Sequence, residues 1–326
     1  MNPLISVIIP VYNTEKYLEE AIASVLQQKT YVHEIIIIND GSTDGSAKLL
    51  DKLYGNFEFV KIIHKENEGQ GVARNVGTNI STGDFIYYFD SDDIIKDGLF
   101  KKFFFLLTQN SDLEIFCFSG KSFLDGKYTI KNTKNKESTV KRNIEAVCSS
   151  GEEAFTLLSK NKSFYVYPWL YLFKKDILLK NNISFKPIKN EDGEFIHHLF
   201  LHGSMTIISN DIYINYRIRA GSTMQIDRSF KDLLGLIKSI ESLEQLAKLD
   251  FLKEDTKVIL TKKITSSIRD VITIKARNKI KMNTDESSFY RTFFSKYILS
   301  NLSLLLFTLS YPIENKLRKL KQQYFN

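Results

Sequence analysis

The stretch from Gly83 to Asp93 reads GDFIYYFDSDD, and it decides the fold class of this chain. Its apolar run Phe85–Phe89 is typical of a strand buried on both faces of a mostly parallel sheet. Asp90, Asp92 and Asp93 follow at once. Because the carboxyl ends of the strands open into the ligand crevice of an α/β sheet, this cluster is placed to hold a cation or a ligand hydroxyl. The alternative is an ordinary acidic turn that caps the next helix.

The alternation of segments around this stretch predicts the rest of the sheet. Strand, turn and helix alternate four times in the first 95 or so residues, with apolar strands expected at Leu4–Val11, Glu34–Asn39, Val60–His64 and Phe85–Phe89. Parallel strands joined by helices form right-handed crossovers. The pattern therefore predicts a doubly wound parallel sheet.

Composition bounds the size and the compartment. The 326 residues are 43% hydrophobic, enough for one large domain or two smaller ones. Cys117 and Cys148 belong to no CxxC pair, so we expect reduced cysteines of a cytosolic protein. Met1–Pro10 already reads as a strand without a basic leader, so no signal peptide is expected.

The formal charge of +7 is concentrated in the tail. Residues 226–326 contain 19 Lys and Arg against 11 Asp and Glu, whereas residues 1–225 contain 26 against 27. This asymmetry predicts an anionic surface as the partner of the tail, and at this level a bacterial membrane and a nucleic acid remain equally open.

Four motifs carry a family resemblance. They are PVYN at Pro10–Asn13, NDGSTDGS at Asn39–Ser46, NEGQGVARN at Asn67–Asn75 and FDSDD at Phe89–Asp93. In this order and spacing they resemble the nucleotide-binding half of family 2 glycosyltransferases of the GT-A fold. The resemblance implies a doubly wound mixed sheet flanked by helices, with a nucleotide-sugar-binding half at 1–110, an acceptor-binding half at 111–225 and a basic helical extension at 226–326.

The resemblance also implies a UDP-sugar donor and the residues that bind it. Asp40 matches the aspartate that accepts a hydrogen bond from uracil, and Pro10 and Tyr12 match residues that line the base. Arg74 would lie near the diphosphate, where a guanidinium fork suits phosphate oxygens. Taken alone, Asp40 also suits an Asx-turn, and Arg74 a solvated helix position.

The DxD pattern of the family falls on Asp90 and Asp92, with Ser91 between them at the nucleotide-sugar site. Asp90 would reach the ribose or a metal-bound water, and Asp92 would ligate the metal. Close carboxylates are unfavourable without a cation between them, and their hard oxygens suit Mn²⁺ or Mg²⁺. Asp93 is interpreted as a helix cap.

Three further segments carry the acceptor and diphosphate predictions. In KNEDGEF, Glu191 and Asp192 resemble the ED motif whose aspartate is the catalytic base, although either residue also suits a helix start. Trp169, the single tryptophan, could offer a face to an acceptor sugar, with core packing as the equal alternative. Arg217 and Arg219 would suit a loop that closes over the diphosphate, as in similar capsule and lipooligosaccharide transferases. The QxxRW motif of processive synthases is missing, which favours transfer of one sugar.

The tail ends in an apolar segment, Tyr297–Ile313, that Pro312 limits to about 15 residues. A spanning helix needs about 20. Because basic residues flank the segment, we expect an interfacial helix on an anionic inner leaflet, with a buried bundle helix as the alternative.

These observations predict an inverting glycosyltransferase that moves one hexosyl or N-acetylhexosaminyl group from a UDP-sugar by metal-assisted direct displacement. The expected acceptor is a surface glycan: lipopolysaccharide, lipooligosaccharide, capsule or a lipid-linked oligosaccharide. The expected location is the cytoplasmic face of the bacterial inner membrane, with no nucleic-acid partner. One alternative is an NAD(P)-binding oxidoreductase, since Gly69-x-Gly71 partly imitates that fingerprint although Arg74 replaces its third glycine. The other is a non-catalytic protein that binds a nucleotide-sugar.

Overall fold

The structure is a computed structural model that describes residues 4–125, 139–219 and 228–299, with Leu304 and Thr308. The chain forms two compact units. The first comprises Met1–Pro187 and Glu191–Thr223, and the second comprises Ile188–Asn190 and Met224–Asn326.

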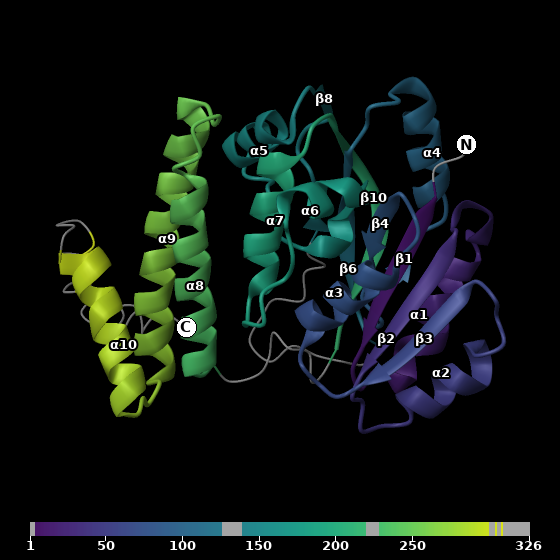
Figure 1. Cartoon of the computed structure of the whole chain (residues 1–326), viewed down its shortest axis with the longest axis horizontal. Coiled ribbons are helices and arrows are strands. Elements are labelled where there is room, and N and C mark those ends of the chain that lie inside the picture. Colours follow the sequence, from purple (N-terminus) through teal and green to yellow (C-terminus); the bar gives the residue numbers. More distant parts are fainter. Residues whose placement is uncertain (1–3, 126–138, 220–227, 300–303, 305–307, 309–326) are drawn as a thin grey trace, which may run out of the picture. The chain divides into compact units, whose positions relative to one another are not determined.

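The four strands expected at the start of the chain form one half of the sheet in the first unit. They lie in the order β3-β2-β1-β4 and are all parallel (Figure 1). Their side chains in β1, β2 and β4 are buried throughout, as the continuous apolar runs predict. Their bounds are β1 Ile5–Val11, β2 Glu34–Asp40, β3 Val60–Lys65 and β4 Phe85–Tyr88.

The order of these strands creates a switch point. The chain proceeds from β1 outward to β3 and then returns to place β4 on the other side of β1. Helices α1 (Glu15–Leu26) and α2 (Ser46–Tyr54) contact each other, whereas α3 (Gln70–Ile80) packs on β1 and β2. In such sheets the ligand crevice lies at the carboxyl ends of the strands beside the switch point, here those of β1 and β4.

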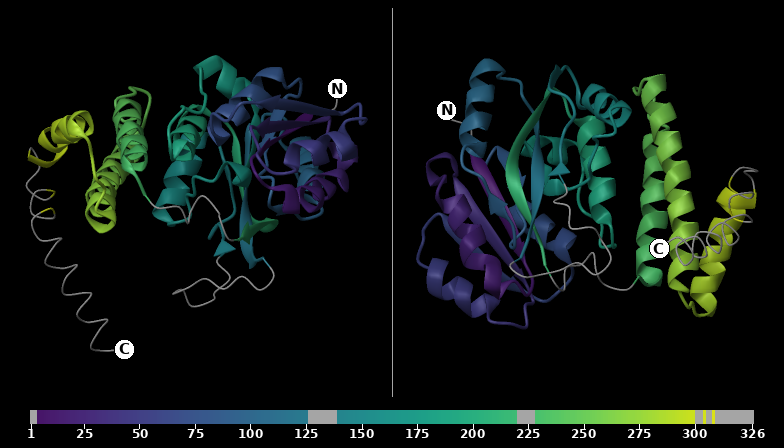
Figure 2. Two further views of the ribbon diagram at one scale, coloured as in Figure 1. Left: turned by 90° about the horizontal axis from the view of Figure 1, so that it is seen from below. Right: turned by 180° about the vertical axis from the view of Figure 1, so that it is seen from behind.

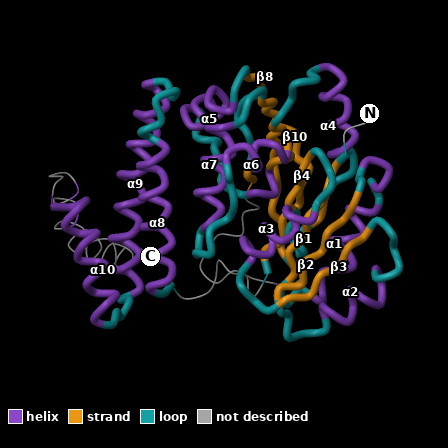
Figure 3. Tube along the Cα trace, in the orientation of Figure 1, coloured by secondary structure: helices purple, strands orange, loops and turns teal. Residues whose placement is uncertain are grey.

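The other half of the sheet is mixed. Strand β9 is antiparallel to both β4 and β6, and β6 is parallel to β10. Figure 3 shows the strands of the sheet in orange, with helices in purple around them. This confirms the mixed doubly wound sheet. The strands are β5 Ile94–Ile95, β6 Ile115–Leu124, β7 Thr139–Val140, β8 Ala146–Cys148, β9 Tyr171–Lys174 and β10 Thr206–Ile218. The helices of this half are η1 Lys29–Tyr31, α4 Leu99–Gln109, α5 Gly151–Lys160, η2 Pro168–Leu170, α6 Lys175–Asn181 and α7 Glu191–His202.

Two local predictions were wrong. The sequence predicts separate strands at Met205–Ser209 and Ile212–Arg217, but β10 is continuous. Its register against β6 shifts between Ile208 and Ile214, so a bulge absorbs the polar residues without ending the strand. The acidic turn also does not cap the next helix, because β5 intervenes and α4 follows Gly98, whose φ is 92°.

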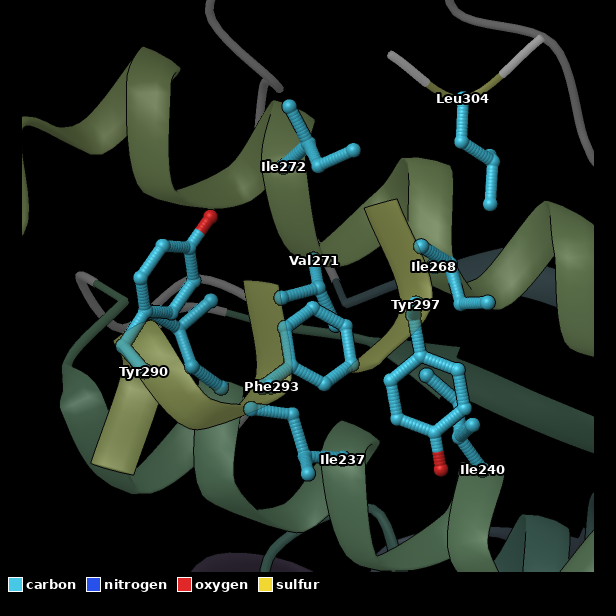
Figure 4. Close-up of a cluster of buried hydrophobic side chains, with 10 residues drawn as sticks. Ile237, Ile240, Ile268, Val271, Ile272, Tyr290, Phe293, Tyr297 and Leu304 are labelled. Atoms are coloured by element: carbon cyan, nitrogen blue, oxygen red, sulfur yellow. The ribbon is translucent and has the colours of Figure 1, made fainter. Parts of the chain in front are cut away.

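The second unit is helical, as predicted for the tail (Figure 2). It contains α8 (Phe230–Leu246), α9 (Glu254–Asn278), α10 (Thr284–Phe294) and the π-helical turn η4 (Ser295–Leu299). Capping boxes begin α8 and α10, each satisfying otherwise unpaired backbone N–H groups. Apolar side chains from all three helices form its core (Figure 4).

The predicted interfacial segment falls mostly on residues outside the described part of the chain. Of its described residues, Tyr297 is buried in the helical core, with its ring 5.0 Å from that of Phe293. Among the described helices, none is both long and apolar enough to cross a membrane.

Candidate active site

The NDGS motif ends strand β2 and anchors the loop before α3. Asp40 is 2% exposed, and its carboxylate accepts hydrogen bonds from Lys65 Nζ (2.8 Å) and from the backbone N–H groups of Glu68 (3.0 Å) and Gly69 (2.8 Å). Gly69 has a φ of 99°, a conformation that suits glycine. Asp40 is therefore held rigidly at the carboxyl end of the sheet. Lys65 was not predicted from the sequence, and its ion pair with Asp40 joins the ends of two neighbouring strands.

The PVYN motif lies beside this turn. Pro10 is buried within β1, whereas Tyr12, just beyond the strand, is 49% exposed and available to a planar ligand. The Asn13 side chain accepts hydrogen bonds from the backbone N–H groups of Thr43 (2.7 Å) and Asp44 (3.3 Å). The first two motifs therefore form one joined surface at the end of β1 and β2.

The residues of the DSDD turn have separate partners. Asp90 Oδ1 accepts hydrogen bonds from Gln70 Nε2 (2.8 Å) and Arg74 Nη2 (2.9 Å). Ser91 shares a hydrogen bond of 2.9 Å with the hydroxyl of Thr14. The Thr14 side chain makes no capping hydrogen bond to α1. Its hydroxyl instead joins the PVYN loop to the DSDD turn.

The last two aspartates of the turn meet β10. Asp92 Oδ2 accepts from Arg219 Nε at 2.7 Å, and the buried Asp93 accepts from the backbone N–H of Arg217 at 2.8 Å. The Arg217 side chain is 7% exposed and donates to the Asp92 carbonyl (2.9 Å) and to Asp125 (3.2 Å). Arg217 therefore connects β10 to the turn through hydrogen bonds. Arg219 is the arginine that pairs with the Asp92 carboxylate.

Arg74 connects the two predicted halves of the site. Its side chain is 1% exposed, with Nη1 2.7 Å from Asp192 Oδ1 and Nη2 2.9 Å from Asp90 Oδ1. The guanidinium lies 5.9 Å from the centre of the Tyr88 ring and 5.2 Å from that of Phe185. The Arg74 guanidinium thus bridges Asp90 and Asp192, which are 102 residues apart in the sequence. A buried cation in such a place is stable because both anions compensate its charge.

The rest of the NEGQGVARN motif positions the ED motif. The Asn75 amide donates to the carbonyl of Phe185 (2.8 Å) and accepts from its N–H (2.9 Å). A Cβ on Gly71 would lie 2.8 Å from Cγ of Glu191, so glycine allows α3 to approach the start of α7. In this motif only Arg74 was predicted to have a role, near the diphosphate, and the contact with the ED motif was not predicted.

The two carboxylates that pair with Arg74 have raised pKa values. Burial raises the pKa of Asp192 to about 6 against the opposing effect of Arg74, with Glu191 adding to the rise. Burial likewise raises the pKa of Asp90 to about 6, with Arg74 opposing and Asp92 and Asp192 adding. A carboxylate with a pKa this close to neutrality is suited to accept a proton in catalysis.

The acidic residues fit a metal that binds together with phosphate. No group of three or more His, Cys, Asp or Glu in the described residues is arranged to hold an ion alone. Mg²⁺ is commonly bound by one or two carboxylates plus substrate phosphates. Asp92 and Asp90 are 22% exposed each and can supply those carboxylates, with Arg219 beside the first.

Trp169 does not present an open face. It is 6% exposed, and its ring lies 5.3 Å from the rings of both Tyr167 and Tyr216. The structure favours the packing alternative for Trp169 and exposes its neighbour Tyr167 instead, at 38%.

Comparisons with known proteins agree with this fold. The family model described as glycosyl transferase family 2 matches residues 6–213. Glycosyltransferase GlyG of Streptococcus pneumoniae serotype 4 is 30% identical over 70% of this chain and 75% of its own length. The cholesterol galactosyltransferase of Borreliella burgdorferi is 27% identical over 90% of this chain and 81% of its own length.

Among solved structures, residues 1–349 of S. aureus TarS in complex with UDP-GlcNAc superpose with a TM-score of 0.64 at 19% identity, covering 83% of this chain and 81% of that one. This likeness supports the fold. The oxidoreductase alternative is wrong, since the matched family transfers sugars. The chain belongs to glycosyltransferase family 2 and is a glycosyltransferase of the GT-A fold.

Proposed function

We propose that this enzyme transfers one sugar from a UDP-sugar to a hydroxyl of a glycan acceptor with inversion, using Mn²⁺ or Mg²⁺. The observation that carries the proposal is the position of Arg74 between Asp90 and Asp192. One carboxylate belongs to the DxD turn at the donor end, and the other begins α7. A single buried side chain thus fixes the distance between a donor site and a base.

The donor assignment rests on the carboxyl edge of the sheet. Asp40 would accept from uracil, Tyr12 would cover the base, and Arg219 lies where it can reach a diphosphate once it leaves Asp92. The TarS structures were obtained in complex with UDP and with UDP-GlcNAc, which supports a UDP-sugar here. Residues 1–110 would supply most donor contacts and residues 111–225 the acceptor contacts.

Asp92, with Asp90, would hold the metal beside the diphosphate. A divalent cation bound there would supply Lewis-acid stabilisation of the charge on the departing UDP. Arg219 is already beside Asp92 and can offer a second positive charge to the same phosphates.

Asp192 would act as the base. It would take the proton of the acceptor hydroxyl while that oxygen bonds to the anomeric carbon, and the bond from this carbon to the UDP oxygen would break on the opposite face. Arg74 holds one carboxylate oxygen of Asp192, so the other oxygen is left to face the acceptor. Direct displacement of this kind needs no covalent intermediate.

Calorimetric titration of UDP tests the donor and metal assignments. We expect UDP to bind in the presence of Mn²⁺, and EDTA and Asp92→Ala each to weaken binding strongly, because EDTA removes the cation that faces the diphosphate and the substitution removes a ligand of that cation. The matched control is Asp97→Ala, an exposed aspartate five positions along the chain. Metal-independent binding would contradict the metal assignment, and binding of NAD in place of UDP would contradict the donor.

The acceptor and the location form the second part of the proposal. A basic helical unit suits a peripheral enzyme on an anionic leaflet, where lipid-linked glycans are assembled. Exposed basic side chains are present on and after α9, at Lys262, Arg269, Arg277, Lys279 and Lys281. These features support a proposed location on the cytoplasmic face of a bacterial inner membrane.

Vesicle sedimentation checks the membrane assignment. The full chain should sediment with vesicles rich in phosphatidylglycerol and stay in the supernatant with pure phosphatidylcholine, because the attraction is electrostatic. High salt should release it, since it screens exposed charges. Equal binding to both vesicle types, or none to either, would contradict the assignment.

A further inference from the structure

A row of aromatic side chains lies in the acceptor half of the first unit. Tyr165, Tyr167 and Trp169 alternate along the segment that leads into η2, and Tyr216 joins them from β10. The rings of Tyr165 and Tyr167 are 6.5 Å apart at 18°, and those of Tyr167 and Trp169 are 5.3 Å apart at 10°. Such near-parallel pairs hold each other's orientation.

The row is built on a rigid base. The fully buried Arg142 lies 5.1 Å from the Tyr165 ring and 5.0 Å from that of Tyr171. A Cβ on Gly120 would lie 2.7 Å from the Trp169 indole, so this position in β6 makes room for the ring. Tyr165 and Trp169 are therefore held in the row by packing against Arg142 and Gly120, respectively.

Tyr167 is the most exposed member of the row. It is 38% exposed, compared with 6% for Trp169. Burial raises its pKa, and Tyr216, Tyr165 and Asp192 raise it further. The Tyr87 hydroxyl of β4 donates a hydrogen bond to the carbonyl of Trp169 (3.1 Å), so the row is attached to the strand that leads into the DxD turn.

We propose that Tyr167 contacts the acceptor sugar, with its ring against the apolar side of a pyranose. The assignment rests on the proposed transferase function and adds the acceptor subsite to it. A pyranose combines an apolar side with a rim of hydroxyls, which matches an exposed aromatic ring in the acceptor half that also carries the carboxylates Glu191 and Asp192. A sterol carries one hydroxyl and fits this pairing of ring and carboxylates less well.

The single tryptophan makes the subsite directly observable. Because Trp169 is stacked under Tyr167, a sugar at Tyr167 should change its fluorescence. The full chain, with UDP and Mn²⁺ present, would be titrated with the methyl glycosides of glucose, galactose and N-acetylglucosamine, and separately with cholesterol in cyclodextrin. The variants are Tyr167→Ala, Tyr167→Phe and, as a control on an exposed ring of α4, Phe105→Ala.

We expect at least one glycoside to change the emission of the wild-type chain. Tyr167→Ala should weaken that glycoside by about tenfold and keep the calorimetric affinity for UDP, whereas Tyr167→Phe and Phe105→Ala should keep both. Unchanged glycoside affinity in Tyr167→Ala would overturn the assignment, as would a response to cholesterol alone or to no glycoside in a chain that binds UDP. Failure to bind UDP would overturn the proposed function itself, and calorimetry detects it independently of the emission.

Discussion

Replacing Asp192 by asparagine should lower the rate of sugar transfer by about 10²–10⁴-fold while leaving the affinity for UDP unchanged. Asparagine keeps an oxygen that can accept the Arg74 hydrogen bond, so the geometry at the start of α7 should survive. It cannot take up the proton of the acceptor hydroxyl. The measurement is kcat for transfer to the acceptor, with calorimetry of UDP on the same preparation.

The pH dependence gives a second test of the same role. Burial raises the pKa of Asp192 to about 6, and only the ionised form can act as a base. The rate should therefore fall as the pH drops through about 6 and level off above it. The Asp192→Asn variant should lose this limb, because its residual rate no longer depends on that carboxyl group.

The control is Asp176→Asn, which changes a half-exposed aspartate on α6 that pairs with Lys180 at the surface. It should keep the wild-type rate and pH profile. If Asp192→Asn transfers sugar as fast as the wild type, or if it loses UDP binding instead of turnover, Asp192 is not the base.

The strands were predictable because each one is a local signal. Runs such as Ile35–Ile38 are buried on both faces, so their composition alone identifies a parallel strand between helices. The motifs were predictable for a related reason: each lies where a strand ends, and a parallel sheet gathers such ends at one edge. Asp40 and Asp90 needed no long-range information to be placed there.

The contacts between motifs were not predictable from local pattern. The ion pair from Arg74 to Asp192 spans 118 residues, and helical periodicity treats an arginine at that position as solvated. Trp169 shows the same limit, because its sequence left sugar stacking and core packing equally open. The large ring of Trp169 suits stacking against a sugar. Its burial, however, depends on Gly120 and Tyr216, which belong to strands β6 and β10. Only the packing shows that the exposed ring is that of Tyr167.

Replacing Arg74 by methionine should give the largest loss of stability of any single change at this site. The substitution keeps the apolar stem between Tyr88 and Phe185 but removes the cation. Asp90 and Asp192 would then face each other without compensation. Breaking a buried pair in this way costs about 3–5 kcal/mol, and we expect the lower end because the two carboxylates are 22% and 31% exposed. Chemical denaturation at neutral pH measures the difference.

The pH dependence of the stability loss distinguishes removal of the Arg74 charge from simple loss of packing. Without Arg74, the pKa values of Asp90 and Asp192 should rise further above their unfolded values, so ionisation at neutral pH is what destabilises the variant. Lowering the pH through these raised values protonates the carboxylates and should narrow the stability gap to wild type. In the matched variant Arg219→Met, which loses the pair with Asp92 next to the diphosphate site, stability should change less and UDP affinity more. A gap for Arg74→Met that is the same at neutral and mildly acidic pH would show that Arg74 acts through packing, and that the two carboxylates do not depend on its charge.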